Sequence, residues 1–265
     1  MSKGDSTKAQ IIFRNYVMER FLERLSISSY RSNLILKGGV LVAAIVGLDN
    51  RSTLDMDATI KNLPLSEESA KKVVEDITNI QIEDGMIFEI KSATPIMDEA
   101  DYPGIRVTLN TTLETMRTPL KIDFSSDDVI TPCEVSYQYK LLFEDRTISI
   151  MAYNLETMLA EKLETFLARG TANSRMRDFY DLFALESTQS ENIDNIVLKA
   201  AFTNTSEKRG SSAVVADMDL ILDEVENSSN ILALWKNYQR KYEYASDISW
   251  YEVMQAVKRM CYAVR

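Results

Sequence analysis

The sequence contains no histidine and only two cysteines among its 265 residues. The absence of histidine excludes enzymes that rely on a Ser-His-Asp or Cys-His pair. It also argues against zinc, because zinc sites are built mostly from Cys and His ligands. Cys133 and Cys261 lie far apart in the chain, which argues against a disulfide framework and favours a reducing, cytoplasmic setting. Acid–base or metal chemistry must therefore come from carboxylates, lysines or tyrosines.

Long apolar runs are missing as well. No stretch of 18 apolar residues occurs, so we expect no membrane span and no membrane partner. The first five residues lead into a charged amphipathic segment and do not resemble a signal peptide, which again predicts a cytoplasmic protein. The net charge is −10, and acidic residues outnumber basic ones in both halves of the chain. General electrostatic attraction to nucleic acid is therefore not supported, and an RNA partner would need a local basic patch.

The first 150 residues mix helical and strand patterns. Apolar residues at helical spacing predict a long helix over 7–27, and Ser66 is placed to cap a helix that runs to about residue 80. Alternating or β-rich stretches punctuated by prolines predict strands. The expected strands are 33–37, 54–60, 86–90, 104–109, 120–124 and 147–150.

After residue 150 the pattern is helical throughout. Asn154 is placed to cap a helix over 155–169, and a second helix is expected over 175–187. The polar stretch 203–212 is predicted to be a loop. We therefore predict an α+β fold with a mixed-sheet N-terminal lobe over 1–150 and an α-helical C-terminal lobe over 151–265. Further helices are expected near 191–202, 212–226, 229–244 and 249–264.

A glycine pair and an acidic pair form the most informative motif. Gly38 and Gly39 follow a short strand and precede a short apolar helix over 39–47, and Asp55 and Asp57 follow on the next strand. Residues two apart on a strand point to the same face, so the two carboxylates repel each other unless a cation lies between them. Hard oxygen ligands suit Mg²⁺, which binds one or two carboxylates together with substrate phosphates. Taken alone, such an acidic pair is more often a solvated strand edge.

Asp123 is a candidate third carboxylate. It lies on the predicted strand 120–124, and if this strand lies beside the strand of Asp55 and Asp57, the three side chains form one cluster. Such a cluster can hold two Mg²⁺ ions and stabilise attack on phosphorus. The simpler alternative, a strand-end carboxylate beside Lys121, has equal weight on the sequence of this strand alone.

Two helical segments carry further charged residues. Lys162 lies in the first helix after residue 150, and Arg175, Asp178 and Asp181 lie around the start of the next. Asp178 and Asp181 are three apart and share a helix face. Ordinary solvated charges, and an acidic residue favoured by the helix dipole, explain these positions equally well.

Taken in order, these motifs resemble the AbiEii/AbiGii family of nucleotidyltransferase toxins. The sequence has Gly-Gly, then Arg-Ser-Thr-x-Asp-x-Asp from Arg51, then Lys-Ile-Asp ending at Asp123. Glu-x-x-x-Ala-x-Lys ending at Lys162 and Arg-x-Arg-Asp-x-Tyr-Asp-Leu from Arg175 complete the series. Each motif is weak singly, but the ordered set spans about residues 30–185. One departure is Val40, which stands where the superfamily often has a hydroxyl residue, so the phosphate grip must rely on backbone amides.

The resemblance implies a polymerase-β-like nucleotidyltransferase fold and assigns roles to residues. A divalent metal, Mg²⁺ or Mn²⁺, and a nucleoside triphosphate (NTP) substrate are implied. The implied metal ligands are Asp55, Asp57 and Asp123. The implied catalytic residues are these three together with Lys162 and Asp178, and the implied nucleotide-binding residues are Gly38, Gly39, Arg51, Thr53, Lys162, Arg175 and Asp181.

The resemblance also implies a biological role. Some relatives add nucleotides to the 3′ end of tRNA and block growth or phage propagation, in toxin–antitoxin and abortive-infection (antiviral defence) systems. A neighbouring antitoxin, often a DNA-binding repressor, is the implied partner.

Two other functions remain open on the sequence. One is nucleotidyl transfer to a protein or small-molecule hydroxyl, which the acidic balance favours slightly. The other is an NTP-binding, specifically GTP-binding, regulatory module without turnover. The aromatic residues around 235–251 either form the core of a helical bundle or stack on bases or on an antitoxin.

Overall fold

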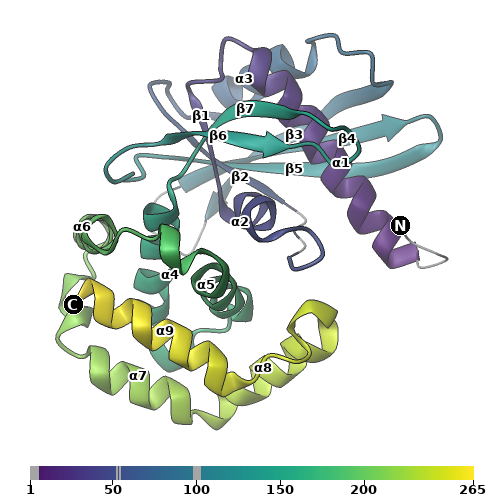
Figure 1. Ribbon diagram of the computed structural model, residues 1–265. Helices are drawn as coiled ribbons and strands as arrows, with labels where there is room; N and C mark the ends of the chain where they lie inside the picture. Colours follow the sequence, from purple (N-terminus) through teal and green to yellow (C-terminus); the bar gives the residue numbers. More distant parts are fainter. Residues whose placement is uncertain (1–5, 52, 54, 98–102) are drawn as a thin grey trace. The chain divides into compact units, whose positions relative to one another are not determined.

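The computed structural model describes residues 6–51, 53, 55–97 and 103–265 (Figure 1). The chain divides into two compact units. Unit 1 comprises Met1–Ala44, Ser52–Asp128 and Glu134–Tyr153, and unit 2 comprises Ile45–Arg51, Val129–Cys133 and Asn154–Arg265.

Unit 1 is built on a seven-stranded sheet with the strand order β3-β4-β5-β2-β1-β7-β6. The β2–β5 and β1–β7 pairs are parallel, and the other neighbours are antiparallel. This mixed sheet, with helices around it, confirms the predicted α+β class. The strands are β1 (Leu34–Lys37), β2 (Met56–Ile60), β3 (Met86–Met97), β4 (Pro103–Leu113), β5 (Met116–Ser126), β6 (Val135–Lys140) and β7 (Thr147–Ala152).

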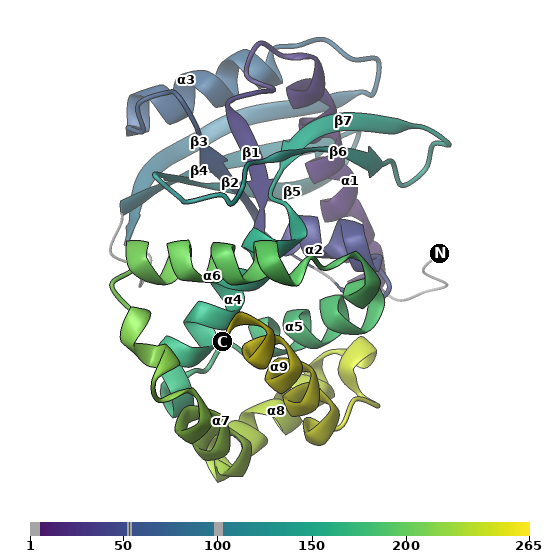
Figure 2. The same cartoon turned by 60° about the vertical axis from the view of Figure 1, so that its left-hand side comes forward.

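Two helices pack on the sheet of unit 1. Helix α1 (Ser6–Ile27) contacts β5 and β7, and α3 (Glu67–Thr78) contacts β3 and β4 (Figure 2). Ser66 caps α3 as expected, because its side chain accepts a hydrogen bond from the Ser69 amide. Alternate residues of β4 and β5 are buried, and the residues between them point to the opposite face of the sheet. The opposite face carries the polar residues described below.

The sheet has one strand that the sequence did not predict. β6 pairs only with β7 and lies at the edge of the sheet, and most of its residues are exposed. The sequence of this segment does carry a strand signal, because Val135, Tyr137 and Tyr139 alternate with polar residues. The signal is short and was overlooked. The expected strand over 54–60 begins at Met56 in the structure, and Leu54 lies outside the described residues.

Unit 2 is helical, as predicted for the C-terminal part of the chain. Asn154 caps α4 by accepting a hydrogen bond from the Thr157 amide. Helix α4 contacts α5, α6, α7 and α9, and its buried side chains form the centre of this unit. The helices are α4 (Leu155–Arg169), α5 (Met176–Gln189), α6 (Asn195–Lys208), α7 (Met218–Asn227), α8 (Ser229–Lys241) and α9 (Trp250–Val264).

The loop predicted over 203–212 is wrong over most of its length. Helix α6 continues to Lys208, because buried Thr205 and Ser206 extend the buried stripe formed by Leu198 and Phe202. Burial on one face keeps this polar stretch helical although its intrinsic helix propensity is low. The helix expected over 212–226 begins later, at Met218, after a short 3₁₀ turn.

The aromatic residues near the C-terminus belong mainly to the core of unit 2. Trp235 and Tyr238 are 1% and 8% exposed and stack with ring centroids 5.5 Å apart. This favours the bundle-core interpretation of the cluster over a base-stacking surface. No helix in the described part of the chain is long and apolar enough to cross a membrane.

Candidate functional site

A row of four charged residues crosses the open face of the unit 1 sheet. Lys37 on β1 pairs with Asp57 on β2, and Asp57 pairs with Asp123 on β5. Asp123 pairs in turn with Arg106 on β4. Directly paired residues on neighbouring strands lie about 5 Å apart at Cα. The structure therefore places two carboxylates side by side and flanks them with one cation at each end.

Asp57 is the electrostatically least favourable member of this row. Burial, together with the nearby carboxylates of Asp123 and Asp55, raises the pKa of Asp57 to about 6. Lys37 and a hydrogen bond from the Gly39 amide act in the opposite direction and offset part of this effect. The charged form of Asp57 is thus under-compensated in the protein alone, as expected of a group that binds a cation.

Gly38 lies so close to the side chain of Asp57 that a residue with a Cβ would clash with it. Gly38 begins helix α2 (Gly38–Val46) and has a φ of +65°, a conformation that residues with a side chain rarely adopt. A Cβ at this position would lie 2.7 Å from Cγ of Asp57 and closer still to its carboxylate oxygen. The Gly-Gly turn therefore allows the backbone to approach the carboxylate that the next strand presents.

Asp123 is held by Arg106. The guanidinium donates from Nε to Oδ1 at 2.7 Å and from Nη2 to Oδ2 at 2.5 Å, a bidentate geometry that fixes the plane of the carboxylate. The hydrogen bond to Asp123 raises the pKa of Arg106, so the guanidinium stays protonated. Arg106 was not among the residues predicted for the site, since only the hairpin register places it beside Asp123.

A buried polar network supports the other end of the row. Asp128 accepts hydrogen bonds from Lys37 Nζ at 2.7 Å and from the hydroxyls of Thr59 and Ser125, each at 2.5 Å. Burial would raise the pKa of Asp128, but Lys37 and the two hydroxyls lower it. Thr59 also bonds the hydroxyl of Tyr153 at 2.9 Å. Lys37 is thereby held next to Asp57, a role that the sequence did not reveal.

The arrangement of the acidic residues indicates how a metal would be held. Thr53 is buried and donates to the Asp55 carbonyl at 3.2 Å, within the turn that precedes β2. Among the described residues, no group of three or more Asp, Glu or Cys side chains is arranged to hold a metal ion. Asp55, Asp57 and Asp123 therefore do not form a complete metal site by themselves. Half-buried hard oxygen donors with an under-compensated charge fit Mg²⁺, which takes its remaining ligands from water and phosphate.

Unit 2 contains a second charged cluster. Arg51 donates to Asp181 from Nε to Oδ1 at 2.6 Å and from Nη2 to Oδ2 at 3.1 Å. Lys162 Nζ donates to Asp178 at 2.7 Å and to Asp181 at 2.8 Å. Arg51 and Asp181 are 1% and 0% exposed, whereas Lys162 and Asp178 are partly accessible. Four of the residues predicted for the site are therefore directly linked.

The charges of this second cluster stabilise each other. Burial opposes charge on Asp181, but Lys162 and Arg51 outweigh it and lower the pKa of this carboxyl. Burial likewise opposes charge on Lys162, but Asp178 and Asp181 raise the pKa of the amine above its ordinary value. Arg175 lies at the start of α5, where its amide bonds the side chain of Asn173. The buried charges of Lys162 and Asp181 are thus compensated by partners within unit 2.

Comparison with protein families gives a match over most of the chain. The family model of the nucleotidyl transferase AbiEii toxin of type IV toxin–antitoxin systems matches residues 20–258. The chain belongs to this family. An AbiEii protein is a nucleotidyltransferase toxin, so the predicted enzyme class is confirmed, and the family implies both an NTP substrate and an antitoxin partner.

Solved structures show the same fold. MenT4, a nucleotidyltransferase toxin from Mycobacterium tuberculosis H37Rv, is 16% identical with a TM-score of 0.57, and the match covers 99% of this chain and 96% of that one. JHP933 from Helicobacter pylori is 15% identical with a TM-score of 0.54, over 96% of this chain and 93% of that one. No curated protein matches the AbiEii chain by sequence.

Proposed function

We propose that this AbiEii protein transfers a nucleotide from an NTP to the 3′ end of a tRNA in a Mg²⁺-dependent reaction. The observation that carries the proposal is the row Lys37–Asp57–Asp123–Arg106 on the open face of the sheet. In the reaction, the acceptor hydroxyl oxygen bonds to the α-phosphorus and the bond to pyrophosphate breaks. The pyrophosphate leaves with the electron pair, and the hydroxyl proton passes to solvent.

Asp57 and Asp55 are the residues that would hold the metal, with Asp123 beside them. Bound Mg²⁺ would supply Lewis-acid polarisation of phosphate oxygens and compensate the charge of the carboxylates. The raised pKa of Asp57 supports this assignment, because neighbouring carboxylates without enough counter-charge favour cation binding. Mn²⁺ has similar oxygen-ligand preferences and is the natural substitute.

The cationic side chains and backbone amides of this chain would bind and orient the reactants. Arg106 fixes the plane of Asp123, and Lys37 reduces repulsion at Asp57. In unit 2, two of the three N–H donors of Lys162 are used by Asp178 and Asp181, which leaves its third donor for a phosphate oxygen. Arg51 is buried against Asp181, so we assign it a positioning role and not direct contact with the nucleotide.

Growth inhibition follows if the acceptor is the 3′ end of tRNA, because an extended end cannot be aminoacylated. Membership of a type IV toxin–antitoxin family supports this role. We propose that the antitoxin is a DNA-binding repressor encoded next to the toxin and that the pair limits phage propagation.

The decisive experiment incubates the protein with Mg²⁺, total tRNA and each of the four α-labelled NTPs in turn. We expect label in RNA for at least one nucleotide. The test variant is Asp57→Asn, and the matched control is Asp145→Asn, which changes an exposed aspartate in the turn between β6 and β7. Activity should disappear in the first variant and persist in the second.

The same assay distinguishes RNA transfer from the two alternative functions, transfer to another acceptor and nucleotide binding without turnover. Label in protein or in a small molecule, with none in RNA, would identify a different acceptor and overturn the RNA proposal. Binding of GTP in calorimetry with no labelled product in any fraction would instead identify a regulatory module without turnover.

A further inference from the structure

The open face of the sheet continues well beyond the charged row. Along β5 the residues that share a face with Asp123 are Lys121, Pro119 and Arg117, because strand residues two apart point the same way and the β4–β5 register is regular. At about 3.3 Å per residue, Arg117 lies about 20 Å from Asp123 along the strand. The face therefore forms a strip that begins at the carboxylates and runs to the β4–β5 turn.

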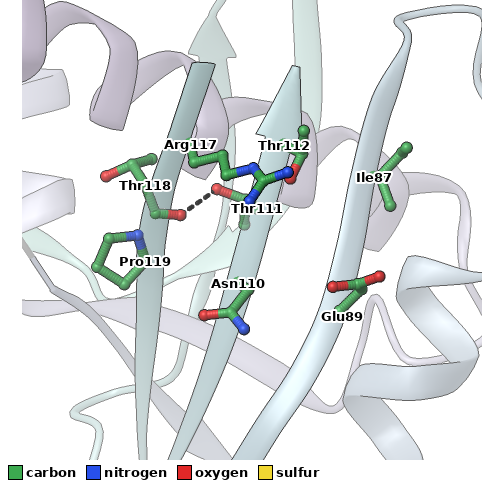
Figure 3. Close-up of a pocket in the computed structure, with 8 residues that line it drawn as sticks. All are labelled: Ile87, Glu89, Asn110, Thr111, Thr112, Arg117, Thr118 and Pro119. Atoms are coloured by element: carbon green, nitrogen blue, oxygen red, sulfur yellow. Dashed lines mark hydrogen bonds between the residues drawn. The ribbon is translucent and has the colours of Figure 1, made fainter. Parts of the chain in front are cut away.

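The far part of this strip is hollowed. A cavity of about 520 Å³ lies over three neighbouring strands (Figure 3). This volume is within the range of sites that bind small molecules, and it is large enough for a nucleobase. Its lining residues are Ile87 and Glu89 of β3, Asn110, Thr111 and Thr112 of β4, and Arg117, Thr118 and Pro119 of β5.

The strip is positively charged in a protein whose net charge is −10. Within the part of the chain that the structure describes, neither Arg117 nor Lys121 has an ion-pair or hydrogen-bond partner. Lys91 is a further exposed cation. It lies at the bulge of β3, next to Ser92, which pairs with Thr108 of β4. Glu89 is the only carboxylate among the residues that line the cavity.

We propose that this strip, defined by Lys121, Arg117 and the cavity between them and β3, binds the single-stranded 3′ segment of an RNA acceptor. The inference rests on the proposed function and names the surface by which the acceptor is recognised. A strip that begins at Asp123 would direct the terminal hydroxyl towards the carboxylates while the preceding nucleotides lie along β5.

The chemistry of the strip matches a single-stranded RNA. Lys121 and Arg117 would contact backbone phosphates, which are the main source of affinity in such complexes. Ile87 and Pro119 are exposed and provide apolar contact for a base, while Asn110 provides donor and acceptor atoms for a base edge. A small cationic acceptor would be repelled by the two unpaired cations.

The experiment compares two double variants. The test variant combines Arg117→Glu and Lys121→Glu, and the control variant combines Lys71→Glu and Lys72→Glu. The control lies on α3, which packs on β3 and β4, and changes the net charge by the same amount. Fluorescence anisotropy with labelled tRNA should show at least tenfold weaker binding for the test variant. The slope of log affinity against log salt should fall by about 1.5, as expected for two lost phosphate contacts.

Two further measurements separate failure of this proposal from failure of the proposed function. Calorimetry with an NTP and Mg²⁺ should give the wild-type affinity for Arg117→Glu, whose side chain is remote from Asp123, while its KM for tRNA rises. Unchanged tRNA binding in the double variant, with wild-type transfer activity intact, would overturn the strip alone. Equal loss in the control pair would also overturn it, and absence of any RNA labelling by the wild type would overturn the proposed function itself.

Discussion

The two units each contain a cluster of four charged residues, and the clusters differ in how their charges are compensated. In unit 1 the carboxylates of Asp57 and Asp123 are neighbours, and the pKa of Asp57 is raised to about 6 by burial and by like charge. In unit 2 Asp181 is wholly buried but lies between Arg51 and Lys162, and its pKa is lowered. Burial opposes the charged form of both aspartates, but their net pKa shifts have opposite signs because only the second unit supplies enough counter-charge.

This difference gives the two clusters opposite effects on stability as pH changes. The pKa of Asp57 rises from an ordinary 3.8 to about 6, so the folded state holds its proton more tightly than the unfolded state does. Its contribution to stability falls as pH rises from about 4 to about 6 in the absence of metal. Asp181 has a lowered pKa, so its contribution is present above pH 4 and is lost as pH falls. The first cluster carries an under-compensated charge, and the second stabilises the fold.

The largest expected effect is the loss of activity in Asp57→Asn. Removing a metal-binding carboxylate should reduce the rate of nucleotide transfer by at least about 10³-fold, comparable with removal of a principal electrostatic contributor to a transition state. The same variant should raise the melting temperature of the metal-free protein at pH 7.5 by a few degrees, because the unfavourable charge is gone. Transfer assays and differential scanning calorimetry test both effects, and a lower melting temperature would contradict the contrast between the clusters.

Asp181→Asn should have the opposite effect on stability. The substitution leaves Arg51 and Lys162 under-compensated, and loss of one partner of a buried ion pair costs about 3–5 kcal/mol. Denaturant unfolding at pH 7.5 measures this loss. Asp178→Asn is the comparison, because Asp178 is 20% exposed and water can replace part of its interaction with Lys162. Equal losses in the two variants would show that burial does not distinguish these aspartates.

Gly38→Ala tests the close approach between the glycine turn and Asp57. The matched control is Gly210→Ala, because Gly210 has a φ of +66° but no atom within 4 Å of the position of a Cβ. The control should lose only about 1 kcal/mol from backbone strain, whereas Gly38→Ala should lose about 2–4 kcal/mol, because a clash is added. Urea unfolding of the two variants gives the difference directly, and equal losses would mean that Asp57 simply moves aside.

The smallest expected effect is stabilisation by Mg²⁺ alone. At ten times its dissociation constant the ion should contribute about 1.4 kcal/mol, or a rise of a few degrees in melting temperature. The rise should be absent in Asp57→Asn and retained in Asp178→Asn, since only the first residue lies in the under-compensated cluster. A metal-dependent shift that persists in Asp57→Asn would place the cation elsewhere.

The parts of this protein that could be predicted from sequence are those encoded locally. The caps at Ser66 and Asn154, the alternation around Asp57 and the helical pattern after residue 154 all depend on neighbours in the chain, and the structure confirms them. Edge strand β6 was also encoded locally, since Val135, Tyr137 and Tyr139 alternate with polar residues, but this short pattern was overlooked. The end of α6 was missed because burial of Thr205 by distant elements overrides its propensity.

The partners of the charged residues could not be predicted, because they depend on long-range pairing. Arg106 meets Asp123 through the β4–β5 register, and Asp128 meets Lys37 from 91 residues away. Asp181 meets Arg51 from 130 residues away. A motif can identify a charged residue, but only the fold shows whether its charge is already compensated. The charge of Arg51 is compensated by Asp181, whereas the charge of Asp57 is only partly compensated.

The assignment of Ile45–Arg51 to unit 2 has a consequence for biosynthesis. Arg51 leaves the ribosome long before Asp181, so its counter-ion does not yet exist while most of the sheet is being made. No single cut yields two complete pieces, because a fragment ending at Tyr153 would retain Arg51 without its carboxylate. The chain must therefore be made at least as far as Asp181 before the buried guanidinium is neutralised. A product that ends earlier would contain Arg51, one of the largest fully buried side chains of the finished protein, without its carboxylate partner.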